Sequence, residues 1–251
     1  MTNTQPGQVI LVTGASQGIG RGVAEALLAD GHQLALAARR IEPLEALAMR
    51  YPGQAMALSV DVSDPAAVDA LYTQIASRYG RLDALFNNAG AFMASTPIGD
   101  VAWDDWRRVL GVNLDGAFLI ARGAFRMMRD QTPQGGRIIN NGSISAYAPR
   151  VNSVAYTTSK HAITGLTKSI ALDGRAHDIA CSQIDIGNAE TPMTEPMKAG
   201  IAQPDGSVMR EPVIDVRHVA DAIRYIIGLP LEANVQFMTV MATKMPYLGR
   251  G

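Results

Sequence analysis

The chain has little of the chemistry that disulfides and metal sites require. Cys181 is the only cysteine among 251 residues, so an internal disulfide cannot form. Because it follows Ile179 and Ala180 in an apolar run, we expect a buried structural thiol rather than a nucleophile. The histidines show no ligand-pair spacing, so we expect no metal site. They are His32, His161, His177 and His218.

Long apolar runs and an excess of charge are missing as well. No stretch approaches the ~18 uninterrupted apolar residues of a membrane span, and the start of the chain, Met1 to Gln8, is polar. The formal net charge of -1 gives no electrostatic reason to expect a nucleic acid or an acidic membrane as partner. We therefore expect a cytoplasmic protein that binds neither nucleic acid nor membrane.

What the chain does contain is a regular alternation of strand-like and helix-like segments. The strand-like segments are Val9–Val12, Leu34–Ala37, Ala55–Val60, Ala84–Asn87, Arg137–Asn140, Ile179–Ile184 and Phe237–Val240. The helix-like segments include Arg21–Ala29, Ala66–Tyr79, Val112–Met128, Tyr156–Asp173 and Val216–Ile227. The alternation predicts an α/β fold, a Rossmann-like doubly wound, mainly parallel sheet of about seven strands with helices on both faces.

One domain accounts for the whole chain. No repeat, low-complexity linker or abrupt shift in composition divides residues 1–251. The segment 188–212 is the exception to the regular pattern, because its prolines and the run Gln203-Pro204-Asp205-Gly206-Ser207 break any periodicity. Its methionines supply flexible apolar surface. The segment reads as a mobile lid or as an ordinary surface loop with methionines packed on the core.

A glycine turn follows the first strand-like segment and precedes a helical pattern. Glycines permit a tight turn and a close approach of the backbone to a pyrophosphate, whose charge meets the amides and dipole at the helix N-terminus. The turn therefore predicts a dinucleotide site, although the motif alone is weak. Its candidate cofactor-binding residues are Gly14, Ser16, Gln17, Gly18, Ile19 and Gly20.

A second pattern, Tyr156 and Lys160 with Ser143 upstream, can reduce a carbonyl without a metal. Residues four apart share one face of a helix, so the Lys160 ammonium can act on the Tyr156 phenol. A nearby cation favours the phenolate, so we expect the pKa of Tyr156 to fall toward the working range of a general acid or base. Ser143 could hold the substrate oxygen by hydrogen bonding. Ser143 lacks the pattern of a hydrolase nucleophile, which disfavours a serine hydrolase.

The order of these motifs resembles the short-chain dehydrogenases/reductases, in their compact single-domain branch. The resemblance spans nearly the whole chain. It rests on Thr13-Gly14-x3-Gly18-x-Gly20, Asn87-Asn88-Ala89-Gly90, Asn113, Ser143 and Tyr156-x3-Lys160.

The resemblance implies a catalytic tetrad of Asn113, Ser143, Tyr156 and Lys160. In it, Lys160 also binds the nicotinamide ribose and Asn113 helps to hold a water on the proton relay. The family interval before the tyrosine selects Ser143 over the nearby Ser145.

The resemblance also implies cofactor contacts elsewhere, and a segment 188–212 that covers the substrate. Asp61 would contact the adenine, although it could equally cap the helix that follows. Ile186 stands where the family usually has proline, which leaves that turn less rigid. The implied contacts are Asp61, Val62, Asn88, Ala89, Gly90, Gly187 and Thr191, besides Tyr156 and Lys160.

The end of the second strand bears on cofactor choice. An acidic residue there would favour NAD by binding the ribose 2′-hydroxyl. This chain has Ala38 followed by Arg39, whose guanidinium can bind a 2′-phosphate through paired hydrogen bonds. We therefore predict a preference for NADP(H) over NAD(H). The alternative is that Arg39 and Arg40 are solvated loop charges, which fits Arg40 better.

Together these patterns predict an NADP(H)-dependent oxidoreductase that interconverts a carbonyl and an alcohol. The alternative is a cofactor-binding regulatory protein of the same fold without turnover. Phe92, Met93, Tyr147 and Val151 indicate a largely apolar substrate pocket, and no arginine or lysine is clearly placed to bind a substrate anion. The resemblance implies a homodimer or homotetramer, formed through the helices that carry Asn113 and Tyr156.

Overall fold

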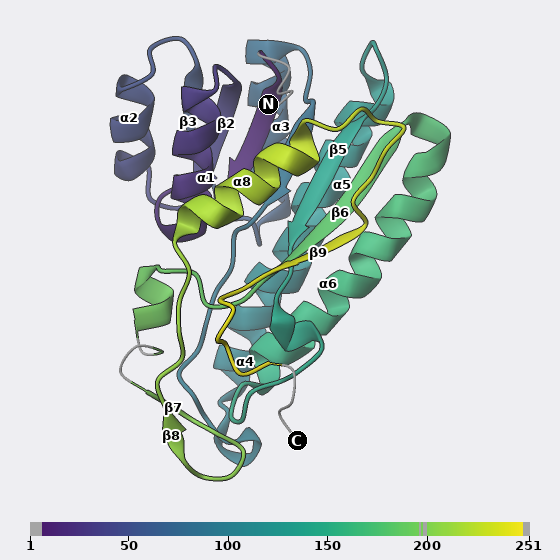
Figure 1. The fold of residues 1–251 in the computed structure, drawn as a ribbon. Coiled ribbons are helices and arrows are strands. Elements are labelled where there is room, and N and C mark those ends of the chain that lie inside the picture. The colour runs from purple at the N-terminus through teal and green to yellow at the C-terminus, as the bar shows by residue number, and fades with distance from the viewer. Residues whose placement is uncertain (1–6, 196, 198–199, 248–251) are drawn as a thin grey trace.

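A parallel sheet forms the centre of the protein. The computed structural model describes residues 7–195, 197 and 200–247. Seven strands pair in the order β3-β2-β1-β4-β5-β6-β9, and every pair is parallel (Figure 1). The strands are β1 (Val9–Thr13), β2 (Gln33–Ala38), β3 (Ala55–Ser59), β4 (Ala84–Asn87), β5 (Gly136–Asn141), β6 (Ile179–Ile186) and β9 (Phe237–Val240). The predicted Rossmann-like fold is confirmed.

Helices cover both faces of this sheet. One face carries α1 (Gly18–Ala29), α2 (Glu42–Met49) and α8 (Val216–Ile227), and the other carries α3 (Pro65–Tyr79), α5 (Ala117–Asp130) and α6 (Val154–Asp173). In Figure 1, α1 and α8 cross in front of the sheet. Each layer buries its own apolar core, so the sheet is covered on both sides. In the described ranges, no helix has the length and apolar character needed to cross a membrane.

The strands form where the sequence has short apolar runs. All five residues of β1 are buried, as expected of a strand that is covered on both faces. Two helical details were not predicted. The short helix α2 was missed, and the predicted helix Val112–Met128 is the later part of a longer one, in which α4 (Trp103–Leu110) continues through a π-helical turn, η2 (Gly111–Gly116), into α5.

The carboxyl ends of the central strands meet at one edge of the sheet. The chain leaves β1 toward β2 and β3, then returns to place β4 on the opposite side of β1. Such a switch point is where open α/β sheets bind ligands. Thr13, Asn87, Asn141 and Ile186 end the four strands around it, so segments far apart in the sequence converge there.

The segment 188–212 leaves this same edge. Its residues 196 and 198–199 lie outside the described residues, and the rest contains a two-stranded hairpin of β7 (Ile201–Ala202) and β8 (Val208–Met209). The hairpin lies beyond one end of the sheet in Figure 1. The N–H of Ile214 donates to the carbonyl of Asn188 at 2.8 Å, which brings the end of the segment back beside its start.

A buried arginine joins β5 to the loop between α8 and β9. Arg137 is only 2% exposed. Its Nη2 donates to the carbonyls of Leu229, Pro230 and Ala233, and its Nη1 donates to Asn234 Oδ1. Burial lowers the pKa of Arg137, and these four acceptors replace the water that the charge has lost.

We expect Arg137→Met to lower the free energy of unfolding by about 2 to 4 kcal/mol, because it leaves buried carbonyls without a donor. Urea denaturation measures the change. Arg126→Met, at an exposed position on α5, is the matched control and should stay within about 0.5 kcal/mol of the wild type. Equal stability of both variants would contradict the role assigned to Arg137.

Candidate active site

A pocket of about 500 Å³ opens at the carboxyl edge of the sheet. It brings together most of the residues that the sequence predicts for the site. Gly20 and Asn113 are the two that lie behind the wall instead of lining it. The predicted residues in the lining are Gly14, Ser16, Gln17, Gly18, Ile19, Arg39, Asp61, Val62, Asn88, Ala89, Gly90, Ser143, Tyr156, Lys160, Gly187 and Thr191.

The glycine turn forms one wall and depends on the absence of side chains. Gly14 and Gly18 have φ of +67° and +57°, in the left-handed region that favours glycine. A Cβ on Gly20 would lie 2.4 Å from the carbonyl oxygen of Gly14 and 2.5 Å from Asn88 Nδ2. The first turn of α1 therefore packs directly on the loop, and its N-terminus faces the pocket, as a pyrophosphate cradle requires.

Asn88 ties this turn to the neighbouring strands. Its Nδ2 donates to the Thr13 carbonyl at 2.9 Å, and its backbone N–H donates to Thr13 Oγ1 at 2.9 Å. Asn141 Nδ2 donates in turn to Asn88 Oδ1 at 2.8 Å. The ends of β1, β4 and β5 are thus joined by side-chain hydrogen bonds at the floor of the pocket.

Two arginines border the pocket at the end of β2. Arg39 and Arg40 are exposed, both line the pocket, and the residue before them is Ala38. Arg40 Nη2 donates to Gln17 Oε1 at 2.9 Å, which holds its guanidinium against the glycine turn. Arg40 thus has a partner in the glycine turn but stays exposed, so its interpretation as a solvated loop charge remains open.

Asp61 lines the pocket after β3, followed by Val62. Its Oδ1 accepts hydrogen bonds from the N–H and hydroxyl of Ser63, which lower the pKa of Asp61, and the charge of Arg39 adds to this effect. The cap of α3 is Asp64, whose side chain accepts a backbone N–H of the first turn. The capping alternative for Asp61 is wrong, because Asp64 already fills that position.

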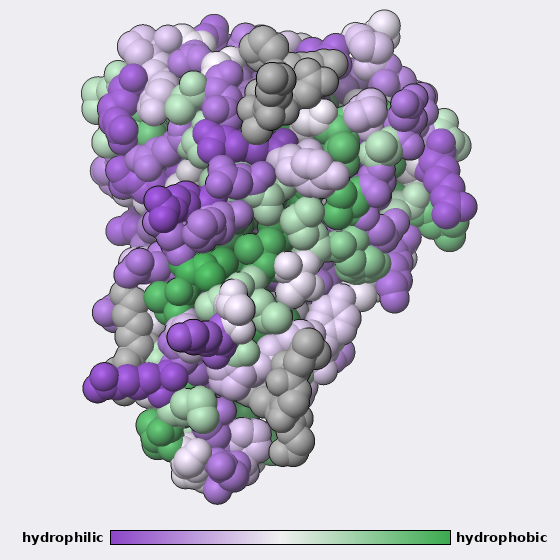
Figure 2. All heavy atoms as spheres, in the orientation of Figure 1, coloured by the Kyte–Doolittle hydropathy of each residue, from purple (hydrophilic) through white to green (hydrophobic). Residues whose placement is uncertain are grey.

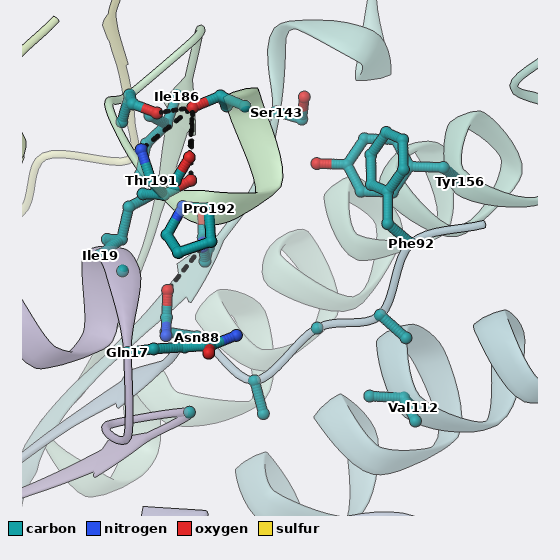
Figure 3. A pocket seen from close by; sticks show the side chains of 18 of the residues that line it. Gln17, Ile19, Asn88, Phe92, Val112, Ser143, Tyr156, Ile186, Thr191 and Pro192 are labelled. Carbon is teal, nitrogen blue, oxygen red and sulfur yellow. Dashed lines mark hydrogen bonds between the residues drawn. The ribbon is translucent and has the colours of Figure 1, made fainter. Parts of the chain in front are cut away.

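Tyr156 and Ser143 face one another at the other end of the pocket. Figure 3 shows the phenol hydroxyl pointing toward Ser143, with the ring of Phe92 lying against the ring of Tyr156. The two ring centroids are 4.5 Å apart, at an interplanar angle of 48°. Burial raises the pKa of Tyr156, and a hydrogen bond to Ser143 opposes the rise. The phenol is therefore held in its neutral form.

Lys160 lies beside the Tyr156 ring without lowering the pKa of the phenol as the sequence pattern predicts. Its Nζ is 5.5 Å from the ring centroid and donates to the carbonyl of Asn141 at 2.7 Å. Burial lowers the pKa of Lys160 to about 8, against the raising effect of Asp185. The expected shift fails because desolvation of the phenol outweighs the charges around it.

Asn113 holds the segment after β4 against α6. It lies in the π-helical turn η2 and is only 2% exposed. Its Oδ1 accepts the N–H of Ala91 at 2.6 Å, while its Nδ2 donates to the Ala91 carbonyl at 3.0 Å and to Ser159 Oγ at 3.2 Å. Irregular turns of this kind are frequent at functional sites. The role of Asn113 on a water stays a prediction.

Asp185, near the end of β6, is a buried carboxylate to which no sequence pattern assigns a role. Its Oδ1 accepts the backbone N–H of Ser143 at 2.9 Å and Gln183 Nε2 at 2.8 Å, and its Oδ2 accepts the Tyr147 hydroxyl at 3.1 Å. Burial raises the pKa of Asp185. The carboxylate therefore fixes the backbone of Ser143. An acidic residue between two isoleucines in a buried strand was the available signal.

The turn after β6 lacks proline but is held by the sheet. Ile186 is 5% exposed and pairs with Val240 of β9. The N–H of Gly187 donates to the Val240 carbonyl at 2.9 Å. Further along, Thr191 forms a reciprocal capping box with Thr194. Both ends of the stretch that contains Gly187 and Thr191 are thereby anchored beside the pocket.

A cation also lines the pocket, where the sequence predicts none at the substrate. Arg150 follows Ser143 in a loop, and its Nη2 pairs with Asn188 Oδ1 at 3.0 Å and with a carboxylate oxygen of Glu211. Both partners belong to the segment 188–212. A contact between loops so far apart in the sequence leaves no local pattern by which it could be predicted.

The remaining candidates carry no site chemistry. Cys181 is fully buried, and burial raises its pKa to about 12, which confirms the prediction of a structural thiol. His32 is buried as well, and desolvation lowers its pKa. Within the part of the chain that the structure describes, no three His, Cys, Asp or Glu side chains gather as a metal site.

Comparisons with known proteins agree on one family. The family model for short chain dehydrogenases matches residues 8–202. A 3beta-hydroxysteroid dehydrogenase of Mediterraneibacter gnavus is 36% identical over 197 residues, which cover 77% of this chain and 70% of that protein.

Solved structures show the same similarity. A short-chain type dehydrogenase/reductase of Mycobacterium marinum superposes with a TM-score of 0.84 at 27% identity, covering 96% of each chain. A 3-ketoacyl-(acyl-carrier-protein) reductase of Brucella melitensis, complexed with NADH, gives 0.82 at 25% identity and covers 94% of this chain and 97% of its own.

We expect the burial of Lys160 to destabilise the folded protein near neutral pH. The pKa of Lys160 falls from 10.5 to about 8 on folding, so the full cost is present below pH 8. The unfolded chain binds more protons between these values, and stability therefore rises with pH until the cost is gone above 10.5. Near pH 7, the free energy of unfolding of Lys160→Met should exceed that of the wild type by about 1 to 3 kcal/mol.

The pH dependence of this difference in the free energy of unfolding shows whether it comes from desolvation of the charged lysine. Urea denaturation near pH 7 and near pH 10 should show the advantage of Lys160→Met shrinking with pH, since the folded lysine is already neutral near pH 10 and no longer carries a buried charge. Lys168→Met, at an exposed position of α6, is the control and should show neither effect. A Lys160→Met variant less stable than the wild type at both values would show that hydrogen bonding to Asn141 outweighs desolvation.

Proposed function

Because the chain belongs to the short chain dehydrogenase family, we propose that it is an NADP(H)-dependent oxidoreductase that reduces a carbonyl to an alcohol and can run the reverse reaction. The observation that carries the proposal is the meeting of Ser143, Tyr156 and Lys160 at the pocket that the glycine turn opens. When bound in this pocket, a nicotinamide cofactor supplies or accepts the hydride.

In the proposed reduction, Tyr156 protonates the substrate oxygen while Ser143 holds it. Burial keeps the phenol neutral, which is the form that can donate a proton. Asp185 accepts the Ser143 N–H at 2.9 Å and so keeps the serine in place as charge develops on the oxygen. These contacts supply the proton donor and the fixed hydrogen-bonding group that the reduction requires.

We assign the return of the proton to Lys160, with Asn113 as the residue that organises the relay. A lysine whose pKa is about 8 exchanges protons readily near neutral pH, unlike an ordinary lysine. Asn113 fixes the position of the neighbouring segments through Ala91 and Ser159. A catalytically silent regulatory protein is not favoured, since all four polar groups are present and the relatives are oxidoreductases.

The preference for NADP(H) rests on the charges at the end of β2. Arg39 and Arg40 border the pocket, and Ala38 leaves no carboxylate there to bind a 2′-hydroxyl or repel a phosphate. Arg40 is held against the turn by Gln17. Two guanidinium groups beside a glycine turn suit the doubly charged 2′-phosphate.

We further propose that the segment 188–212 closes over the substrate and that the protein forms a homodimer or homotetramer. Phe118 on α5 and Leu172 on α6 are large apolar side chains left 47% and 61% exposed. Figure 2 shows hydrophobic residues gathered across the middle of the face on which Figure 1 places the edge strand β9. Such surfaces suit self-association. The cytoplasmic location stays a prediction.

Tyr156→Phe should lower kcat for carbonyl reduction by about 100- to 10,000-fold, because the proton donor is removed while the ring remains. NADPH binding, followed by the quenching of protein fluorescence, should be retained. Tyr225→Phe, which alters an exposed tyrosine of α8, serves as the matched control and should keep full activity. Turnover of Tyr156→Phe near the wild-type rate would rule out the proposed acid.

Arg39→Glu should lower the ratio of kcat/KM for NADPH to that for NADH by about 10- to 100-fold, since a charge-assisted contact is lost and a repulsive one is gained. Arg175→Glu changes the net charge equally at an exposed position outside the pocket and should leave the ratio unaltered. An unchanged ratio in Arg39→Glu with a large fall in Arg40→Glu would move the phosphate site to Arg40.

A further inference from the structure

One side of the pocket contains a guanidinium whose position is fixed by buried partners. Arg150 Nη2 donates to Asn188 Oδ1 at 3.0 Å and to Glu211 Oε2. Asn188 Nδ2 donates to the same Glu211 oxygen at 2.9 Å, which closes the triangle. The Glu211 side chain is fully buried and that of Arg150 is 18% exposed. The guanidinium is therefore held rigidly with part of its surface open to the pocket.

Arg150 still has hydrogen-bond donors to offer. An arginine carries five N–H donors, of which Nη2 supplies two. Among the described residues, Nε and Nη1 of Arg150 donate no hydrogen bond to a protein acceptor. Arg150 lines the same pocket as Ser143 and Tyr156, and its charge lowers the pKa of the Tyr156 phenol. The side chain that carries these unused donors thus lines the cavity in which the substrate carbonyl would react.

The charges around these donors decide what they can bind. The carboxylate of Glu211 balances the charge of Arg150, and Asp185 does the same for Lys160. An anionic substrate group would approach Arg150 and Glu211 together, so attraction and repulsion would largely cancel. A neutral oxygen can accept the N–H donors without this penalty. Nearby lining residues such as Phe92, Ile144 and Met197 are apolar.

We propose that Arg150 determines substrate specificity by binding a neutral oxygen, a hydroxyl or a second carbonyl, that the substrate carries near its reacting carbonyl. The inference rests on the proposed carbonyl reduction for the placement of the substrate. The substrate that we propose for the protein is an uncharged, largely apolar ketone or aldehyde with one further oxygen. Asn188 and Glu211 act as positioning residues that aim the guanidinium.

Substrate recognition would explain why the protein contains the buried ion pair of Arg150 and Glu211. A buried pair of opposite charges adds little stability compared with apolar residues of the same size. Both partners of Arg150 come from the segment 188–212, so the contacts that aim the guanidinium also hold that segment against the pocket. Substrate recognition and the position of the proposed lid are therefore linked through one side chain.

The test compares three ketones that differ in one group: cyclohexanone, cyclohexanone with a hydroxyl group on the ring, and cyclohexanone with a carboxylate at the same position. With NADPH, the wild type should show a kcat/KM for the hydroxyl compound at least about tenfold above that for the other two. Arg150→Met should lower the ratio of kcat/KM for the hydroxyl compound to that for cyclohexanone by about 10- to 100-fold, whatever its effect on the reaction common to both.

Arg150→Lys covers the case in which Arg150→Met does not fold, because a lysine still balances Glu211 while offering fewer directed donors. It should also lose most of the preference for the hydroxyl compound. Arg210→Met, at an exposed position next to Glu211, is the matched control and should retain it. Equal losses for all three ketones in a folded Arg150 variant would overturn the proposal, as would a wild-type preference for the carboxylate.

Glu211→Gln tests the argument from charge. It keeps hydrogen-bonding atoms beside Arg150 but removes the balancing carboxylate. The carboxylate ketone should then gain at least about tenfold in kcat/KM relative to the hydroxyl compound. No gain in a folded, NADPH-binding variant would show that Glu211 does not set the preference for neutral groups.

A readout without turnover separates this inference from the proposed function. Calorimetry can measure the binding of cyclohexanol and of a cyclohexanediol to the NADPH-saturated protein. If the wild type reduces no ketone yet binds the diol at least about tenfold more tightly, and Arg150→Lys removes that difference, the proposed reaction fails while the recognition by Arg150 stands. Equal affinities for the two alcohols would overturn the recognition.

Discussion

The hydrogen bonds of the Asn88 side chain are the constraint on which the site depends. They hold the end of β1 through Thr13 and the end of β5 through Asn141, whose carbonyl accepts the ammonium of Lys160. The same Nδ2 lies within 3 Å of the positions that Cβ atoms on Gly14 and Gly20 would take. The side-chain amide of Asn88 thereby connects the glycine turn to the segment that holds Lys160, so the two positions depend on one another.

Close to these hydrogen bonds the protein buries charged side chains, which an apolar core would exclude. Lys160 and Asp185 lie at the tetrad, and Arg150 and Glu211 lie beside it, all buried or nearly so. Each of these two cations has an acidic group near it that partly balances its charge. The pKa of Lys160 shows the cost of this arrangement, since burial lowers it to about 8. Proton exchange near neutral pH is what such a lysine makes available.

The segment after β6 connects recognition to the scaffold. Ile186 and Gly187 are fixed by β9, and Ile214 returns to Asn188, so both ends of the segment are anchored at the sheet. Between these ends, Glu211 reaches Arg150 in the loop that follows Ser143. Movement of the segment would alter the position of a guanidinium in the pocket while leaving the tetrad on its rigid strands and helix. A scaffold of this kind separates catalysis from the choice of substrate.

The sequence by itself determined the order of strands and helices, the glycine turn and the helical spacing of Tyr156 and Lys160, because each depends on residues close together in the chain. It did not determine the short helix α2, the π-helical turn at Asn113, the raised pKa of Tyr156 or the roles of Asp185 and Arg150. Only the tertiary structure decided these. Desolvation depends on everything packed around a group, and a hydrogen bond between distant loops exists only once the sheet has brought them together.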